Sequence, residues 1–212
     1  RPARPAERVG PAHREAAAHY RVALDHAAAA GDERRAELLE CWAYESTLTN
    51  VIDDDVLNAR LESIELRKRL GQVEMVGMNQ RWISRLLRLM ARKPESEQWL
   101  DEAIATLESV PPGAELAMAY SMRSSIYMLT NQCKLSEQWG HRAIELAKRV
   151  GAPEIEAHAL NNVGSALVDD GQPRGFDLLG QSLAISLEHG FHEHAARAYV
   201  NATECALRSR FL

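Results

Sequence analysis

The chain has few cysteines and no long run of apolar residues. Cys41, Cys133 and Cys205 are far apart and odd in number, so we expect buried thiols in a reducing, cytoplasmic compartment and no disulfide framework. No stretch approaches the roughly 20 apolar residues that a bilayer-spanning helix needs. The first residues, Arg1 to Pro5, are not followed by the apolar run of a signal peptide. We therefore expect no membrane contact.

Positive charge is scarce relative to negative charge. Lys and Arg number 25 against 30 Asp and Glu, which gives the 212 residues a formal net charge of −5. Domains dedicated to nucleic acids are usually basic, so we expect no direct nucleic-acid contact by this segment. No glycine is followed by lysine, which excludes the phosphate loop Gly-x-x-x-x-Gly-Lys-Ser/Thr.

Groupings of catalytic or metal-binding residues are also lacking. His189, His192 and His194 lie close together, but a zinc site needs a fuller set of ligands and there is no His-Glu-x-x-His, so we interpret them as a turn surface. Asp53 to Asp55 precede a predicted helix and are typical of an N-terminal cap, without the spacing of a calcium loop. No set of catalytic roles can be filled. We predict no enzyme activity, no metal and no cofactor.

The most informative pattern that is present is a repeat of about 40 residues. A small residue followed by a branched aliphatic one recurs at Ala23-Leu24, Ser63-Ile64, Ala103-Ile104, Ala143-Ile144 and Ser182-Leu183. Eight residues after each small residue comes a helix stop: Gly31, Gly71, Pro111, Gly151 and Gly190. A fixed period in this range is the signature of a repeat array, which is built to present a long binding surface.

Apolar residues recur at three- and four-residue steps almost throughout, which predicts helices, and no run alternates as a strand would. The helices that carry the aligned small residue, called B helices, are expected at 12–30, 54–70, 95–109, 134–150 and 174–189. The helices that follow each stop, called A helices, are expected at 33–50, 73–92, 114–131, 153–169 and 192–211. Residues 1–11, with three prolines, are expected to be a linker or disordered terminus. Residues 12–212 are then one all-α repeat domain of about ten helices, truncated at both ends.

Close helix packing gives a reason for the small residues. Helices pack at about 8–10 Å, and the closest approach requires small side chains. Besides the aligned B-helix residue, the position seven residues earlier is Ala16, Val56, Ser96, Ser136 or Gly175. The position thirteen after each stop, on the A helices, is Tyr44, Ser84, Ser124, Gly164 or Thr203. We expect these positions to mark helix crossings.

These spacings resemble the tetratricopeptide repeat. The best matches are Leu160-x-x-Val163-Gly164-x-x-Leu167 with Gly171, and Ala16-x-x-x-Tyr20-x-x-Ala23. The usual period of that family is about 34, so each hairpin here carries extra turns. The resemblance implies a right-handed superhelix in which the A helices line a concave groove.

A closer resemblance covers nearly the whole chain. The stretches that carry it are HREAAAHYRVAL from His13, RWISRL from Arg81, PPGAELAMAYS from Pro111, HALNNVG from His158 and EHAARAY from Glu193. They look like the repeat region of actinobacterial large ATP-binding regulators of the LuxR type. The resemblance implies a region that senses a small molecule or a protein and relays the signal to ATPase and DNA-binding domains outside this chain. A stand-alone interaction scaffold and fusion to another output, such as a cyclase, stay open as alternative functions. Whether the chain forms a homodimer also stays open.

The ligand-facing positions of the tetratricopeptide family can be carried over to this sequence. They are Trp42, Glu45, Arg81, Trp82, Arg85, Ser121, Ser125, His158, Asn161, Asn162 and Ser165. Arg81, Arg85 and Arg88 recur at i, i+4 and i+7, a stripe that could hold a carboxylate or phosphate bidentately. The alternative is a solvated face that pairs with neighbouring acids.

The tryptophans and the asparagine pair have two interpretations each. Trp42 and Trp82 offer a flat apolar surface to a ligand, or they pack between repeats. Asn161 and Asn162 are poor helix formers in the middle of a helix, so their presence needs a reason. They hydrogen-bond a groove ligand, or they satisfy the backbone of a neighbouring helix.

Overall fold

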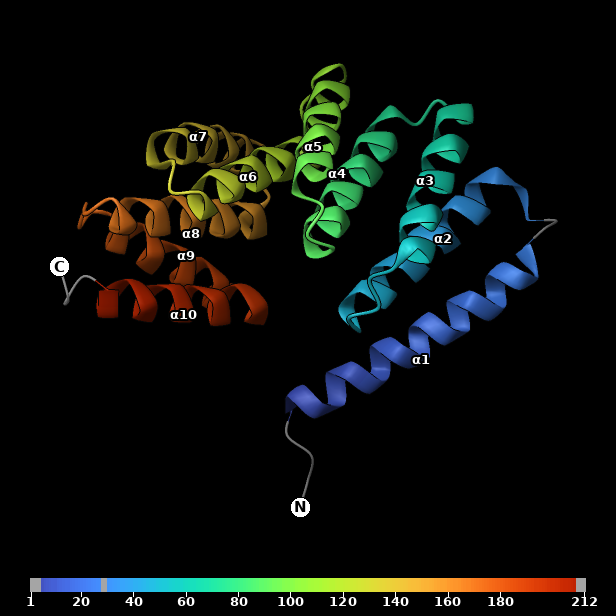
Figure 1. Ribbon diagram of the computed structural model, residues 1–212, viewed down its shortest axis with the longest axis horizontal. Helices are drawn as coiled ribbons and strands as arrows, with labels where there is room; N and C mark the ends of the chain where they lie inside the picture. Colours follow the sequence, from blue (N-terminus) through green and yellow to red (C-terminus); the bar gives the residue numbers. More distant parts are fainter. Residues whose placement is uncertain (1–4, 28–29, 209–212) are drawn as a thin grey trace. The chain divides into compact units, whose positions relative to one another are not determined.

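The computed structural model describes residues 5–27 and 30–208 of the chain. Within these residues all regular secondary structure is helical, with ten α-helices and no strand, which confirms the all-α prediction (Figure 1). No helix in this part of the chain is both long and apolar enough to cross a bilayer. The chain divides into two units, Arg1–Val110 and Pro111–Leu212, and each is described by itself.

The first unit is a series of helices in which each packs against the next. Its elements are α1 (Pro5–Asp25), α2 (Gly31–Leu48), α3 (Asp54–Arg69), α4 (Val73–Leu89) and α5 (Lys93–Glu108). From α2 onward the observed ends lie within a few residues of those predicted. The exception is α1, which begins at Pro5 and ends at Asp25 where 12–30 was expected.

The expected linker at residues 1–11 is therefore wrong for its second half. Residues 5–11 belong to α1, and residues 1–4 lie outside the described part. Proline fits the first turn of a helix, because the N–H group that it lacks would have no partner there in any case. Pro5 is the first residue of α1, where we had interpreted the prolines as part of a helix-free segment.

The second unit is built around one buried helix. Its elements are α6 (Ala114–Leu129), α7 (Cys133–Val150), α8 (Pro153–Asp169), α9 (Gly175–Glu188) and α10 (His192–Arg208). Helix α8 packs against all four others, and most of its residues from Ile155 to Val168 are buried. The A helices α6, α8 and α10 are neighbours in the order α6, α8, α10, which is the arrangement expected for helices that line one face of an array.

Left-handed residues end most of the helices. The predicted stops Gly31, Gly71, Gly151 and Gly190 all have positive φ angles, from 68° to 74°. Gly171 adopts the same conformation after α8, and the non-glycine residues Asn50, Ala91 and Asn131 do so after α2, α4 and α6. A left-handed residue lets the chain turn back while the last carbonyls of the helix accept hydrogen bonds. The cap predicted at Asp53 is also present, because its side chain accepts from the Val56 N–H at 3.0 Å.

Small residues mark the crossing points of the hairpins, as predicted. Ser96 Oγ donates to the Ser84 carbonyl at 2.7 Å, and Ser124 Oγ donates to the Ser136 carbonyl at 2.8 Å. In the third such hairpin the pair is Gly164 and Gly175. A Cβ at Gly175 would lie 2.4 Å from the Gly164 carbonyl oxygen, so only glycine fits. The backbones of α8 and α9 therefore approach each other more closely than any side chain allows.

Candidate functional site

Helix α4 holds a cluster of cationic side chains around Trp82, here called the Trp82 cluster. The guanidiniums of Arg81 and Arg85 each lie 5.4 Å from the centroid of the Trp82 ring. Arg60, which comes from α3, lies 5.0 Å from the same centroid. The edge of the Tyr44 ring meets Trp82 with 5.5 Å between centroids. The negative face of an aromatic ring attracts cations, so Trp82 holds these guanidiniums together.

A buried network of hydrogen bonds and ion pairs connects the Trp82 cluster to α2 and α3. Arg60 Nη1 donates to Asn79 Oδ1 at 3.0 Å, and Asn79 Nδ2 donates to Glu40 Oε1 at 2.7 Å. Glu40 accepts both Arg67 Nε at 2.9 Å and Arg67 Nη2 at 2.7 Å, a bidentate pair. All four side chains are buried. The geometry of the cluster is therefore fixed by charge-assisted hydrogen bonds that reach across α2, α3 and α4.

Arg88 extends the cluster toward the end of α4. Burial and the neighbouring charge of Arg85 both lower the pKa of the Arg88 guanidinium. Arg88 forms no ion pair with any acidic residue in the described ranges, whereas Arg81 is buried and Arg85 is exposed. The predicted i, i+4, i+7 stripe thus does not form one solvated face. The three guanidiniums instead differ in their exposure to solvent, and the charge at Arg88 is partly desolvated.

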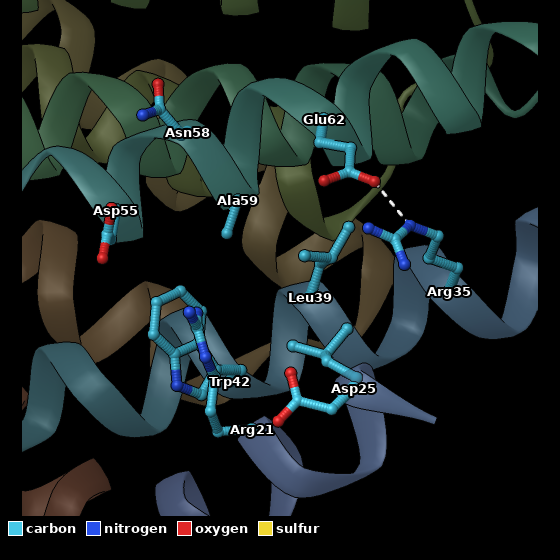
Figure 2. Close-up of a pocket in the computed structure, with 10 residues that line it drawn as sticks. Arg21, Asp25, Arg35, Leu39, Trp42, Asp55, Asn58, Ala59 and Glu62 are labelled. Atoms are coloured by element: carbon cyan, nitrogen blue, oxygen red, sulfur yellow. Dashed lines mark hydrogen bonds and ion pairs between the residues drawn. The ribbon is translucent and has the colours of Figure 1, made fainter. Parts of the chain in front are cut away.

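Trp42 lies one period before Trp82 and has a similar partner. The guanidinium of Arg21, from α1, lies 5.0 Å from its ring centroid, as Arg60 does with Trp82. Trp42 lines a pocket of about 280 Å³ between α1, α2 and α3 (Figure 2). At another wall of the same pocket, Arg35 Nε donates to Glu62 Oε1 at 2.5 Å, so these two charges already satisfy each other.

Glu45, although predicted beside Trp42, is engaged elsewhere. His13 Nδ1 and Glu45 Oε2 are 2.5 Å apart and join α1 to α2. The Trp82 side chain, in turn, meets three guanidiniums and the Tyr44 ring. Packing between consecutive helix pairs describes Trp82 better than an open platform for a ligand ring does. Packing between repeats was one of the two interpretations that the sequence left open for Trp82.

In the second unit, Ser121, His158 and Asn162 form a compact polar group between α6 and α8. Ser121 Oγ and His158 Nδ1 are 2.6 Å apart. Asn162 Nδ2 donates to the Ser121 carbonyl at 2.9 Å, and Arg197 from α10 donates to Asn162 Oδ1. Asn162 therefore satisfies the backbone of a neighbouring helix, which was one of its two predicted roles. Ser125, one turn beyond Ser121, is also buried on α6.

Asn161 and Ser165 are different, because each keeps a polar atom without a partner. Asn161 Oδ1 accepts from Asn201 Nδ2 at 2.6 Å, but Asn161 Nδ2 is buried and makes no hydrogen bond. Ser165 Oγ is likewise buried and unbonded. The two residues are 2% and 3% exposed, and buried polar groups normally have a hydrogen-bond partner.

The histidines near residue 190 separate in the structure. His194 Nε2 and Glu154 Oε1 are 3.1 Å apart, and the His194 ring also meets the His158 ring at 5.7 Å between centroids. His189 stacks on Phe191 instead. Among the described residues no group of three or more His, Cys, Asp or Glu side chains could hold a metal ion.

The predicted site residues therefore form separate groups in separate units. In the first unit lie Trp42, Glu45, Arg81, Trp82 and Arg85; in the second lie Ser121, Ser125, His158, Asn161, Asn162 and Ser165. Sequence reasoning missed Arg60 and the Glu40–Arg67 pair. A signal existed for Arg60, because residues 21 and 60 are about one period apart, as are residues 42 and 82.

No protein-family model and no curated protein sequence matches the chain. Its fold is similar to that of a solved structure described as the crystal structure of BtubC (BKLC) from P. vanneervenii. The two share 14% sequence identity with a TM-score of 0.60, over 93% of this chain and 74% of the other. At this identity the likeness concerns the fold alone.

Proposed function

We propose that this chain is a non-enzymatic binding region that senses an anionic ligand or an acidic segment of a partner. The observation that carries the proposal is the Trp82 cluster. In a chain of net charge −5, three guanidiniums surround one ring, and a fourth, at Arg88, is partly desolvated without a described acidic partner. An anion that reached Arg85 and Arg88 would relieve their mutual repulsion and gain charge-assisted hydrogen bonds.

We further propose that the chain is the repeat region of a cytoplasmic LuxR-type transcriptional regulator. The uncommon phrases from His13, Arg81, Pro111, His158 and Glu193 support it, together with the paired-helix fold that such a region requires. Buried thiols at Cys133 and Cys205 fit a reducing compartment. A bound anion that contacts adjacent helices would change how consecutive hairpins pack, which is how a repeat array could relay a signal.

Thermal-shift measurements test anion sensing. Citrate, pyrophosphate and a poly-glutamate peptide are added to the chain at low salt, and we expect at least one to raise its Tm. Arg85→Gln and Arg88→Gln should abolish the response. Arg69→Gln is the matched control, because Arg69 is an exposed arginine of the same unit that already pairs with Asp32 at 2.7 Å. No response in wild type, or an equal response in all variants, would show that the cluster is structural only.

The regulator assignment has a separate test. The coding sequence on both sides of this segment should encode a nucleotide-binding ATPase domain upstream and a helix-turn-helix domain downstream. If neither domain is present, the assignment is wrong and the stand-alone scaffold takes its place, whatever the anion experiment shows.

A further inference from the structure

A second pocket lies wholly within the second unit, between α6, α8 and α10. Its volume is about 340 Å³, within the range of roughly 300–1,000 Å³ that is typical of small-molecule sites. The residues that line it are Met128, Leu129, Asn131, Ser165, Asp169, Asn201, Glu204 and Arg208. None of them belongs to the Trp82 cluster, so this pocket is independent of the function proposed above.

One wall of the pocket carries an unsatisfied hydrogen-bonding group, the Ser165 hydroxyl. Ser165 lines the pocket, and its hydroxyl has no partner. Asn161 lies one helical turn before Ser165 and is connected to the pocket wall through Asn201, which donates to Asn161 Oδ1 at 2.6 Å. The Ser165 hydroxyl can donate or accept a hydrogen bond. This wall is therefore complementary to an uncharged oxygen of a ligand.

The charged residues of the pocket favour a cationic group of a ligand, whereas the wall at Ser165 favours an uncharged oxygen. Arg208 Nη2 lies 3.1 Å from Asp169 Oδ1, so these two charges largely cancel. Glu204 is exposed and forms no ion pair with a described residue, which leaves one excess negative charge. A cationic group of a ligand would be attracted to Glu204 and Asp169. Met128 and Leu129 supply an apolar wall that suits methylene groups.

From this arrangement we infer that the pocket binds a small primary amine that carries a hydroxyl group at its far end. The ligand hydroxyl bonds to the Ser165 hydroxyl, and the ammonium pairs with Glu204. A carboxylate in place of the hydroxyl is disfavoured, because the wall at Ser165 holds no cation to offset its desolvation.

A matched set of four six-carbon probes tests the inference: 6-amino-1-hexanol, hexylamine, 1,6-hexanediol and 6-aminohexanoate. Binding to the full 212-residue chain is followed by NMR titration of methyl-labelled methionine, with the Met128 signal assigned by its loss in Met128→Leu. We expect 6-amino-1-hexanol to bind most tightly and to shift Met128 above the other methionines. Removal of either the hydroxyl or the amine should weaken binding about tenfold, the value of one hydrogen bond or ion pair.

Two variants separate the two ends of the ligand. Glu204→Gln should weaken the binding of 6-amino-1-hexanol and of hexylamine but leave the binding of 1,6-hexanediol unchanged. Its control is Glu193→Gln, the same change at an exposed residue of the first turn of α10. Ser165→Ala should weaken the binding of both hydroxyl-bearing probes and leave the binding of hexylamine unchanged.

Ser165→Ala also has a readout without ligand. Because the Ser165 hydroxyl has no partner in the free protein, its removal should leave the free energy of unfolding unchanged or higher. Ser182→Ala, which removes a hydroxyl that donates to the Ala157 carbonyl at 2.7 Å, should lower it. Equal affinities for all four probes, no shift at Met128, or equal binding by wild type and both pocket variants would each overturn the inference.

Discussion

The guanidinium of Arg60 lies 5.0 Å from the centroid of the Trp82 ring and also donates to Asn79 Oδ1 at 3.0 Å. One side chain on α3 thus contacts an aromatic ring and an amide that both belong to α4. Arg60 is 2% exposed, so neither contact is weakened by water. Arg60 therefore connects α3 to α4 and is also a member of the Trp82 cluster.

We expect Arg60→Met to lower the free energy of unfolding by about 1–3 kcal/mol, because it removes a cation–π contact and leaves Asn79 short of a donor. A double-mutant cycle with Trp82→Leu, measured by urea denaturation, should give a coupling energy of about 0.5–1 kcal/mol. The same cycle on Arg21 and Trp42 is the control, and its coupling should be smaller because Arg21 is exposed. A coupling of zero at Arg60 and Trp82 would contradict the contact.

Glycine is required at the crossing of α8 and α9 but not elsewhere in α9. A Cβ at Gly164 would lie 2.8 Å from the Gly175 carbonyl oxygen, so Gly164→Ala should destabilise the protein by about 1–3 kcal/mol through overpacking. At the exposed Gly180 nothing lies within 4 Å of a new Cβ. Gly180→Ala should therefore stabilise the helix by up to about 1 kcal/mol. Urea denaturation of both variants checks the opposite signs.

The buried Glu40–Arg67 pair should be far more sensitive than an exposed pair. Glu40→Gln leaves the Arg67 guanidinium buried without its counter-charge, and we expect a loss of about 3–5 kcal/mol. Glu37→Gln breaks the exposed pair with Arg34, whose atoms are 2.9 Å apart, and should cost under about 1 kcal/mol. Thermal and urea unfolding of the two variants compare them directly, and similar losses would show that Arg67 finds another partner.

Two of the three thiols should be slow to react. Burial raises the pKa of Cys133 and of Cys205, so their thiolate fractions are small near neutral pH. Cys41 is only half-buried and should be labelled first by a disulfide reagent such as DTNB. The other two should react fully only after urea unfolds the chain, and fast labelling of Cys133 or Cys205 in the folded protein would contradict their burial.

The same shifts set the sign of a pH dependence. The folded chain keeps both thiols protonated at pH values where the unfolded chain has begun to ionise them. Their contribution to stability is therefore complete below the ordinary thiol pKa of about 8.5 and is lost as the pH rises above it. Urea denaturation at pH 7 and pH 9 should show a loss that Cys133→Ser with Cys205→Ser reduces.

Local features of the sequence predicted most of the fold. Glycine stops, helical periodicity and small residues at fixed spacing located α3 to α9 and the crossing of Ser84 with Ser96, because each depends on nearby residues. The left-handed conformation of Ala91, with a φ of 60°, was not predicted. Most residues other than glycine avoid that conformation, so an alanine does not indicate it. Here the tertiary turn between α4 and α5 overrides the local preference.

The site was harder to predict, because its geometry depends on contacts between distant residues. Glu40 and Arg67 are separated by 27 residues, and Asn79 is 39 residues from Glu40. A stripe of arginines on one helix indicates charge but says nothing about which acids reach it. The unsatisfied atoms of Asn161 and Ser165 were equally out of reach, since only the packed structure shows which polar groups lack partners.

The serine crossings also bear on how the chain folds. Ser84 and Ser96 are 12 residues apart, as are Ser124 and Ser136, so each hairpin closes a short loop. Loops of about ten residues close in roughly 10–100 ns, and chains dominated by such local contacts fold in microseconds to milliseconds. Each hairpin can therefore form on its own timescale before it docks on the next. Stopped-flow refolding should then be fast, and substitutions at a crossing should slow folding more than they speed unfolding.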